Sequence, residues 1–263
     1  MITAEWVIKQ FEEWAPASYA EEWDNVGLLV GDSNQPVKKI LVALDATEDV
    51  INEAVSGGFD FIISHHPLIY NPIKRVNSAD STGQKIITLI KSNIGCYCAH
   101  TNLDKANNGV NDCLAEKIGL ENLSPLIPEP GDCEKPFGLG RVGFLPKELT
   151  LSELASHLKL ALNLPSIRIS GDSSKKIKKV ALCGGDGSGS RFIEAAISQN
   201  CDAYITGDLR YHVVQEALES GITFLDITHY GGEIPIVDAI VSRLKPHVEI
   251  FPSSIYGQVF SSV

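Results

Sequence analysis

Residues 59–64 read Phe-Asp-Phe-Ile-Ile-Ser, and residues 201–206 repeat this pattern as Cys-Asp-Ala-Tyr-Ile-Thr. Each segment follows an apolar run that opens with two lysines, at residues 38–44 in the first copy and at 178–182 in the second. Short apolar runs that alternate with helical patterns are typical of α/β folds with mainly parallel sheets. The sequence therefore predicts an α/β protein built from two similar repeats.

The repeat extends outward to a third apolar run in each half, which ends at His100 in the first and at His229 in the second. The polar loop at 71–83 accounts for the extra length of the first copy. Residues 121–138 carry four prolines and two glycines and predict a connector. We therefore expect two halves, residues 1–126 and 127–263.

Several local signals predict individual helices. Residues 3–14 show the apolar spacing of an amphipathic helix, and residues 48–56 form a helical pattern that Gly57 and Gly58 stop. Asn107 or Asn108 is the expected cap of a helix that ends near residue 118. The segment Thr150-Leu-Ser-Glu153 has the capping-box pattern that begins a helix.

Histidines and carboxylates gather where the predicted strands end. His100 and Asp104 are four residues apart, and so are their aligned counterparts His229 and Glu233. A His-His-Pro segment, with His65 and His66, ends another predicted strand. Ligands collect at the carboxyl ends of parallel strands. Imidazole with carboxylate suits zinc, iron, manganese, cobalt or nickel and disfavours calcium. These side chains are enough for two divalent ions.

Each cluster also has an ordinary structural interpretation. His65 and His66 could bond to backbone groups at a strand end, and His100 and His229 could make local contacts with the carboxylates four residues later. For an isolated His-His pair the structural interpretation is the better one. Three clusters at equivalent strand ends together favour a metal site.

Two weaker signals lie in the second half. The loop from Gly184 to Ser190 follows a strand and opens a helix, so its backbone amides could hold phosphate. A tight turn with Ser188 or Ser190 as helix cap explains it equally well. Asp208 and His212 occupy the strand end opposite the two adjacent histidines and could line a cavity, with His212 moving protons.

Composition narrows the class of protein. A net charge of −11 argues against a broad electrostatic surface for nucleic acid. No apolar run is long enough to span a membrane, and the first residues lack the pattern of a secretion signal. The six cysteines show no C-x-x-C spacing, so we expect reduced thiols in a cytoplasmic protein.

Five segments together resemble the Nif-three-like family, whose members are also called GTP cyclohydrolase 1 type 2 homologues. They are Trp23-Asp-Asn-Val-Gly-Leu-Leu-Val-Gly, Ser64-His-His-Pro, His100-Thr-Asn-Leu-Asp, Ile205-Thr-Gly-Asp and Thr228-His-Tyr-Gly-Gly-Glu. The resemblance spans nearly the whole chain. It implies two intertwined α/β repeats with a dinuclear metal site between them, and a toroidal homohexamer.

The resemblance also implies roles for single residues. His66 and Asp104 would hold one metal, while His65 and His229 would hold the other. Glu233 would bridge the two ions. His100 would lie beside the site as an auxiliary group and is a candidate catalytic residue, together with Asp208 and His212.

The leading functional hypothesis is a dinuclear metal hydrolase that acts on a small molecule such as a cyclic amide, a nucleotide ring or a phosphoester. A metal carrier or cofactor-assembly protein would use the same ligands but release the ion. A regulatory scaffold with a structural metal is the third hypothesis.

Overall fold

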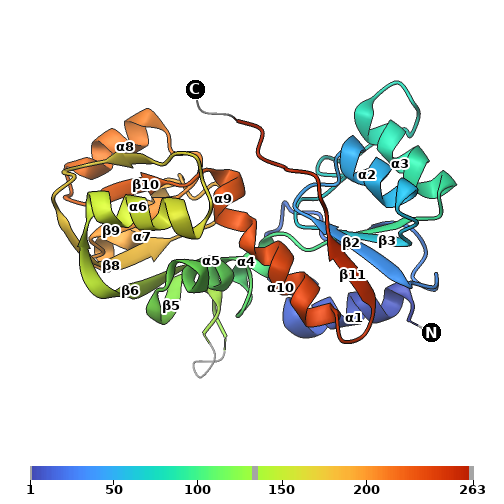
Figure 1. Ribbon diagram of the computed structural model, residues 1–263, viewed down its shortest axis with the longest axis horizontal. Helices are drawn as coiled ribbons and strands as arrows, with labels where there is room; N and C mark the ends of the chain where they lie inside the picture. The colour runs from blue at the N-terminus through green and yellow to red at the C-terminus, as the bar shows by residue number, and fades with distance from the viewer. Residues whose placement is uncertain (1, 132–135, 261–263) are drawn as a thin grey trace. The chain divides into compact units, whose positions relative to one another are not determined.

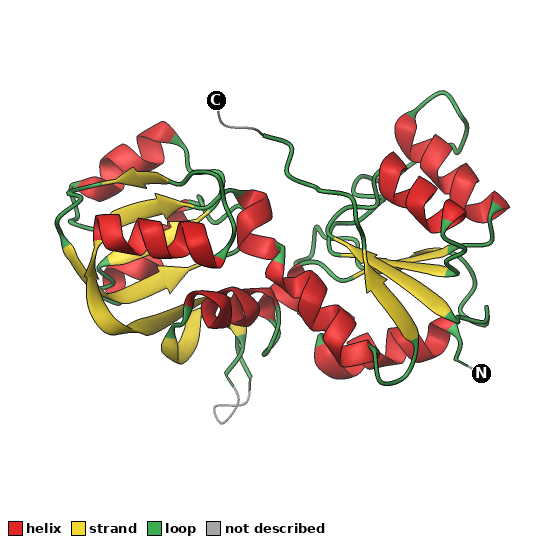
Figure 2. Ribbon diagram, viewed as in Figure 1, coloured by secondary structure: helices red, strands yellow, loops and turns green. Residues whose placement is uncertain are grey.

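The computed structural model describes residues 2–131 and 136–260, and they form two compact units. The first unit comprises residues 1–103 and 237–257, and the second comprises residues 104–236 and 258–263. Each unit is an α/β structure around one mixed sheet, with helices on both faces (Figure 2). The expected division into residues 1–126 and 127–263 concerns sequence similarity and stays a prediction.

The sheet of the first unit has the order β1-β4-β3-β2-β11. The strands β2, β3, β4 and β11 pair in parallel, whereas β1 is antiparallel to β4. Helices α2 and α3 pack on one face, and α1 lies on the other (Figure 1). The bounds are α1 Ala4–Trp14, a 3-10 turn Ala17–Tyr19, β1 Gly27–Val30, β2 Lys39–Ala43, α2 Glu48–Ser56, β3 Phe61–Ser64, α3 Ser81–Lys91, β4 Gly95–Cys98 and β11 Glu249–Pro252.

The sheet of the second unit has the order β5-β6-β8-β9-β10-β7. Only β8, β9 and β10 pair in parallel, so this sheet is mixed rather than mainly parallel. Helices α5 and α6 cover one face and α7 and α8 the other. The bounds are α5 Val110–Ile118, β5 Glu121–Pro128, β6 Gly138–Thr150, α6 Leu151–Ala161, β7 Arg168–Ser170, β8 Lys176–Leu182, α7 Ser190–Ser198, β9 Ala203–Thr206, α8 Tyr211–Leu218, β10 Thr223–Asp226 and α9 His229–Glu233.

Two helices lie where the chain changes unit, namely α4 Thr101–Lys105 and α10 Pro235–Leu244. No helix in the described ranges has the length and apolar character needed to cross a membrane. The five cysteines that the structure describes are free, in line with the expected reduced thiols, and Cys133 lies outside the described residues.

The same aspartate contact recurs in both sheets. Asp60 accepts hydrogen bonds from the backbone N–H groups of Lys38 and Lys39, each at 2.9 Å. Asp202 accepts from Lys178 and Lys179 in the same way, at 2.9 and 2.8 Å. In each sheet the aspartate thereby joins the start of one parallel strand to the start of the next. These aspartates are the second residues of the aligned sequence segments.

The local helix signals were mostly correct. α2 covers residues 48–56 as expected, and Thr150 caps α6 with both capping-box hydrogen bonds to Glu153. α5 differs in its start, because its N-cap is Gly109, and the Asn108 backbone instead donates to Asp112 at 2.6 Å.

The prediction of a connector at 121–138 was wrong for residues 121–128, which form a strand. β5 occupies Glu121–Pro128 and pairs with β6. β5 is the edge strand of its sheet, and an edge strand tolerates Pro125 and Pro128 because one side of its backbone needs no partner. The prolines therefore mark an edge rather than a loop.

Candidate metal centre

The end of β3 explains how two adjacent histidines can serve one site. The His65 N–H bonds to the Ala43 carbonyl at 3.2 Å, and the His66 N–H bonds to the Leu44 carbonyl at 2.8 Å. The Ser64 hydroxyl donates to the His66 carbonyl at 2.8 Å, which folds the chain back on itself. The strand stops before the histidines, so the alternation of side chains that would separate them no longer applies.

Three histidines of the first unit converge. His65, His66 and His100 each offer a ring nitrogen, and these nitrogens all lie within 4.8 Å of one another. The ring centroids are 5.0 to 5.5 Å apart. His65 is fully buried, and the other two rings are partly exposed. The ring nitrogen of His100 is thus as close to the group as those of the other two histidines. Its expected auxiliary role stays a prediction.

The outer nitrogen of each ring is held by an acceptor. The Nδ1 of His65 lies 2.8 Å from the Ala99 carbonyl, that of His66 lies 2.9 Å from Asp45, and that of His100 lies 2.8 Å from Asp24. An imidazole that donates from Nδ1 has its lone pair on Nε2. Histidines that bind metals are oriented by this kind of contact, which also raises their basicity.

Asp24 is the most firmly held of these acceptors. Its side chain is buried and also accepts hydrogen bonds from the backbone and hydroxyl groups of Thr101. Burial alone would raise the pKa of Asp24, but the hydrogen bonds from His100 and Thr101 and the charge of His100 lower it to about 2. Asp24 is therefore ionised at neutral pH and orients His100.

Sequence reasoning did not identify Asp24 or Asp45 as site residues. Asp24 is 76 residues from its histidine, so no local spacing links the two. Asp45 comes two residues after β2 and could have been found, because the same rule about strand ends that selected the histidines applies to it.

The second unit contributes His229 and Glu233, which lie one turn apart on α9. The His229 Nε2 is 3.2 Å from a Glu233 oxygen, and the His229 Nδ1 is 2.9 Å from Asp208. Asp208, expected to line a cavity, is thus the acceptor behind His229. Glu233 is 3% exposed, so this carboxylate lies where an ion or a hydrogen bond must compensate its charge.

The backbone before His229 is strained. Thr228 has a φ of +65°, which a β-branched residue rarely adopts. Its hydroxyl accepts a hydrogen bond from the Gly231 N–H and caps α9, and the Gln258 side chain donates to the same oxygen at 3.0 Å. Asp208 also has a positive φ, of +53°. Strain of this kind concentrates at functional sites, where surrounding contacts must hold it.

The glycine-rich loop packs against this pair of side chains. A Cβ on Gly185 would lie 2.2 Å from a Glu233 oxygen, and Gly185 has a φ of +67°. The Gly184 N–H bonds to the Asn111 side chain, which in turn donates to the Asp104 carbonyl, each at 2.9 Å. The cap of α7 is Gly189 rather than either serine. The loop thus allows Glu233 to approach the backbone closely.

Asp104 and Glu233 share a neighbourhood in the second unit. Burial raises the pKa of the Cys183 thiol, and the negative charges of Asp104 and Glu233 raise it further. Cys183 stays a protonated thiol under these conditions. The carboxylates of the predicted ligand set therefore belong to the second unit, and the three grouped histidines belong to the first.

His212 has a different environment. It is exposed on α8, and its ring packs edge-on against Tyr211 at 5.2 Å. Its expected role in proton transfer stays a prediction. His157 bonds to the Ile118 carbonyl, and His247 packs against Trp6.

The donor set suits divalent transition metals. The four candidate histidines each have Nδ1 engaged, which in His65, His66 and His100 favours the tautomer that leaves the Nε2 lone pair for a metal. In His229 both ring nitrogens face carboxylates, those of Asp208 and Glu233. Imidazole nitrogens together with the buried carboxylate of Glu233 form a mixed N/O set. The fold and these side chains define an α/β protein with histidine and carboxylate groups able to bind metal.

Residues 2–256 match the family Duf34/NIF3 (NGG1p interacting factor 3). A GTP cyclohydrolase 1 type 2 homolog from Clostridium perfringens is 39% identical over 92% of this chain and 91% of its own length. A Streptococcus pneumoniae protein with the same name is 37% identical over 91% of this chain and 89% of its own. The chain therefore belongs to the Duf34/NIF3 family.

The solved structures agree. The crystal structure of a Staphylococcus aureus protein superposes with a TM-score of 0.90 at 30% identity, covering 100% of this chain and 99% of that one. A Bacillus cereus protein related to NIF3 gives a TM-score of 0.91 at 27% identity with the same coverage. The family resemblance noted from the sequence is thus confirmed over the whole fold.

Proposed function

We propose that this protein binds two divalent metal ions per chain and uses them for hydrolysis. The observation that carries the proposal is the common arrangement of its four histidines, each oriented by an acceptor on Nδ1. His65 is held by a backbone carbonyl, but His66, His100 and His229 are each held by a carboxylate, a contact that histidines serving only the backbone would not need. The proposed ligands are His65, His66, Asp104, His229 and Glu233, with Glu233 shared by both ions, and His100 is a further candidate.

The chain's own residues divide the work. Asp24, Asp45 and Asp208 hold three imidazoles in orientation and keep them basic. Gly185 leaves room for the Glu233 carboxylate. A divalent ion bound there would supply Lewis acidity and would lower the pKa of a bound water towards neutral. Asp208 and His212 remain candidate groups for proton transfer.

The duplicated architecture supports two metal positions. The parallel strands β2-β3-β4 and β8-β9-β10 follow the same order, and the Asp60 and Asp202 contacts are equivalent. We infer that the chain is built from two intertwined sequence repeats, each of which carries a histidine four residues before a carboxylate. Two such pairs, together with the adjacent histidines, offer enough groups for two ions.

Hydrolysis is favoured over metal carriage by how tightly the ligands are held. A carrier must release its ion, which is easier from mobile, exposed ligands. His65 and Glu233 are instead buried, at 0% and 3% exposure. The names of the relatives point to GTP as a first substrate to test.

The first experiment measures metal and turnover in one preparation. Purified protein is reconstituted with zinc, manganese or iron and analysed for metal per chain, and each form is then assayed for opening of the GTP purine ring. The proposal predicts about two ions and metal-dependent turnover of GTP or another cyclic amide or phosphoester. Saturation at one ion in every case contradicts the dinuclear site.

A metal acceptor separates the hydrolase from the carrier. The loaded protein is mixed with a chelator of moderate affinity, and release of the ion is followed with time. Retention through many turnovers supports the hydrolase, and rapid transfer without turnover supports the carrier. Partner binding that survives loss of the metal ligands would instead support a scaffold.

We extend the proposal to assembly as a toroidal homohexamer and to a cytoplasmic location, in keeping with the free thiols that the structure describes. Light scattering behind a sizing column measures the mass. A strictly monomeric protein at micromolar concentration would contradict the hexamer.

A further inference from the structure

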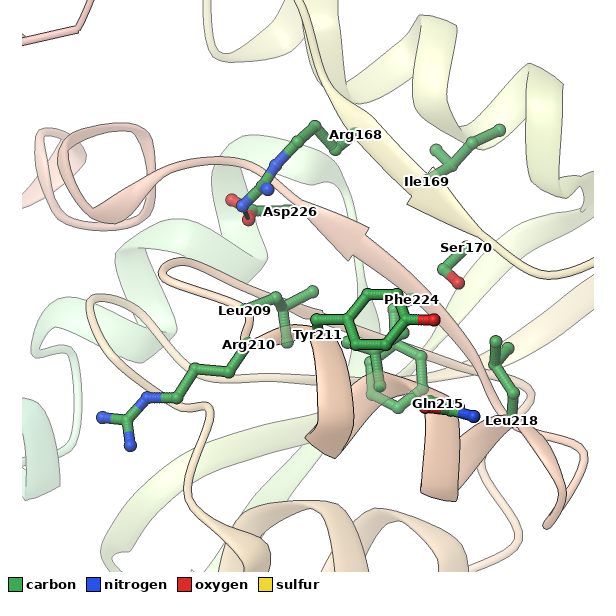
Figure 3. Close-up of a pocket in the computed structure, with 11 residues that line it drawn as sticks. Arg168, Ile169, Ser170, Leu209, Arg210, Tyr211, Gln215, Leu218, Phe224 and Asp226 are labelled. Atoms are coloured by element: carbon green, nitrogen blue, oxygen red, sulfur yellow. Dashed lines mark hydrogen bonds and ion pairs between the residues drawn. The ribbon is translucent and has the colours of Figure 1, made fainter.

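A pocket of about 370 Å³ lies in the second unit, away from the predicted ligand set in sequence but joined to it by short segments. Its walls come from β7 and α8, and β10 contributes Phe224 and Asp226 (Figure 3). The volume falls within the range of small-molecule sites. The pocket lies towards the carboxyl end of β10, where ligands of parallel strands bind.

Aromatic and aliphatic groups form most of the lining. Phe224 is buried, whereas Tyr211 is 75% exposed. Leu209, Val214 and Leu218 complete the apolar part. The exposed Tyr211 ring stands at the edge of an apolar lining, so a ring of a ligand that covered it would remove apolar surface from water.

One arginine supplies a fixed positive charge. Arg168 and Ser170 are two residues apart on β7, so both face the pocket. The Arg168 guanidinium bonds to Asp226, whose other oxygen accepts from the Thr228 N–H at 2.9 Å. Asp226 is 4% exposed, while Arg168 is 75% exposed. The buried carboxylate therefore orients the guanidinium, and further N–H donors of Arg168 stay available to an oxyanion.

The second arginine is oriented differently. Arg210 is 73% exposed and lies 3.6 Å from Asp186. In Figure 3 its guanidinium points away from Tyr211 and Ser170. Arg210 and Arg168 are thus alike in type and exposure, but the Arg168 guanidinium lies against Asp226 of the pocket lining, whereas that of Arg210 lies by Asp186, outside the lining.

Both walls of the pocket continue into the groups around His229. Leu209 follows Asp208, the acceptor on the His229 Nδ1. Asp226 bonds to the backbone of Thr228, the strained residue before His229. A molecule in the pocket would therefore contact, on one wall, the residue after the acceptor Asp208 and, on the other, a residue three positions before His229.

We propose that this pocket binds the ring-bearing part of a small organic anion, with the ring on Tyr211 and a carboxylate, sulfonate or phosphate on Arg168. As the substrate pocket of the proposed metal centre it rests on the proposed function, but the binding itself does not need the metal. The test therefore measures binding alone.

The experiment uses two fluorescent probes that share their rings and differ in charge. Anilinonaphthalene sulfonate carries an anion, and N-phenylnaphthylamine does not. Both are titrated into the full-length protein, zinc-loaded and chelator-treated, and into the variants Arg168→Leu, Tyr211→Ala and Arg210→Leu. The substituted side chains are all exposed, and circular dichroism checks that each variant is folded.

The expected result is specific to each variant. Arg168→Leu lowers the affinity for the sulfonate probe about tenfold, which corresponds to the loss of one charged hydrogen bond, and leaves the affinity for the neutral probe unchanged. Tyr211→Ala weakens both probes about fivefold. Arg210→Leu, the matched control for loss of charge, changes neither. Affinities that do not depend on Arg168 or Tyr211, or an absence of binding by folded protein, overturn the proposal.

The two proposals fail in different ways. If the protein binds no metal but the affinities of the probes depend on Arg168 and Tyr211, the pocket proposal is supported and the proposed metal function is wrong. If the protein binds metal but the affinities of the probes do not depend on these two residues, only the pocket proposal is wrong.

Discussion

The two units solve the problem of holding metal ligands in different ways. In the first unit three imidazoles converge, and the negative charges of Asp24 and Asp45 stand behind them. In the second unit a buried carboxylate, Glu233, lies directly beside His229. The first unit thus supplies three imidazole nitrogens that lie close together, and the second unit supplies the negative charge of Glu233. In the proposed metal centre, the second unit would therefore determine how much metal is retained, and the first would determine how the metal is oriented.

Glu233→Gln tests this contrast most severely. The change removes the buried charge that both ions are proposed to share, so metal content after zinc reconstitution should fall from about two ions per chain to below one. Glu194→Gln, an exposed glutamate on α7, is the control. Full retention of metal by Glu233→Gln would show that the charge of the second unit is not what holds the ions.

The next effect concerns the three-histidine group. Because the three ring nitrogens converge, His65→Ala and His100→Ala should each remove about one ion per chain to the same extent. His247→Ala is the control, since that ring packs on Trp6. Elemental analysis decides. A clearly smaller loss in His100→Ala would make His100 auxiliary, as the family resemblance implies.

The acceptors behind the histidines should give intermediate effects. Asp24→Asn and Asp208→Asn each weaken the orientation of one imidazole and should lower zinc affinity by roughly 10–100-fold. Asp24 is buried and Asp208 is half exposed, so Asp24→Asn should cost more. Competition with a zinc-binding dye measures both. Equal losses would mean that burial of the acceptor does not matter.

The glycine loop allows a finer test of the second unit. Gly185→Ala places a methyl group against the Glu233 carboxylate at a positive φ, so it should lower both stability and zinc affinity. Gly221→Ala also has a positive φ, of +83°, but nothing lies within 4 Å of its added carbon. Both variants should lose about 1 kcal/mol of unfolding free energy from the backbone. Only Gly185→Ala should also lose metal affinity.

The smallest effect is expected at Glu53 of the first unit, which bonds to the residues that follow β11. Burial of Glu53 would raise its pKa, but hydrogen bonds from Ser253 and Ser254 outweigh this and lower it. A depressed carboxyl pKa contributes stability that is present above the unfolded value of 4.5 and is lost as the pH falls through the lower folded value. Glu53→Gln should therefore flatten the acid side of the stability profile, measured by urea unfolding between neutral and acid pH.

Much of the fold could be predicted because its signals are local. The capping box at Thr150 and the helix at 48–56 depend on residues a few positions apart. The strand ends that carry the histidines followed from apolar runs and their breaks. β5 was missed because proline argues against a strand until the neighbouring strands show that it lies at an edge.

The groups that tune the site could not be predicted in the same way. Asp24 reaches His100 across 76 positions, and Asn111 joins Gly184 across 73. These contacts depend on tertiary packing, which no spacing rule encodes. The strain at Thr228 is likewise invisible in a sequence where threonine is an ordinary residue before a helix.

The interrupted first unit has a consequence for synthesis on the ribosome. β11 pairs with β2, yet more than 190 residues separate the two strands in the chain. During translation the β2 edge stays without that neighbour until β11 has emerged, while residues 104–236 of the second unit are already available to fold. An exposed strand edge is a site for wrong pairing with other nascent chains. β11, the last strand among the described residues, is therefore the one that closes the first sheet.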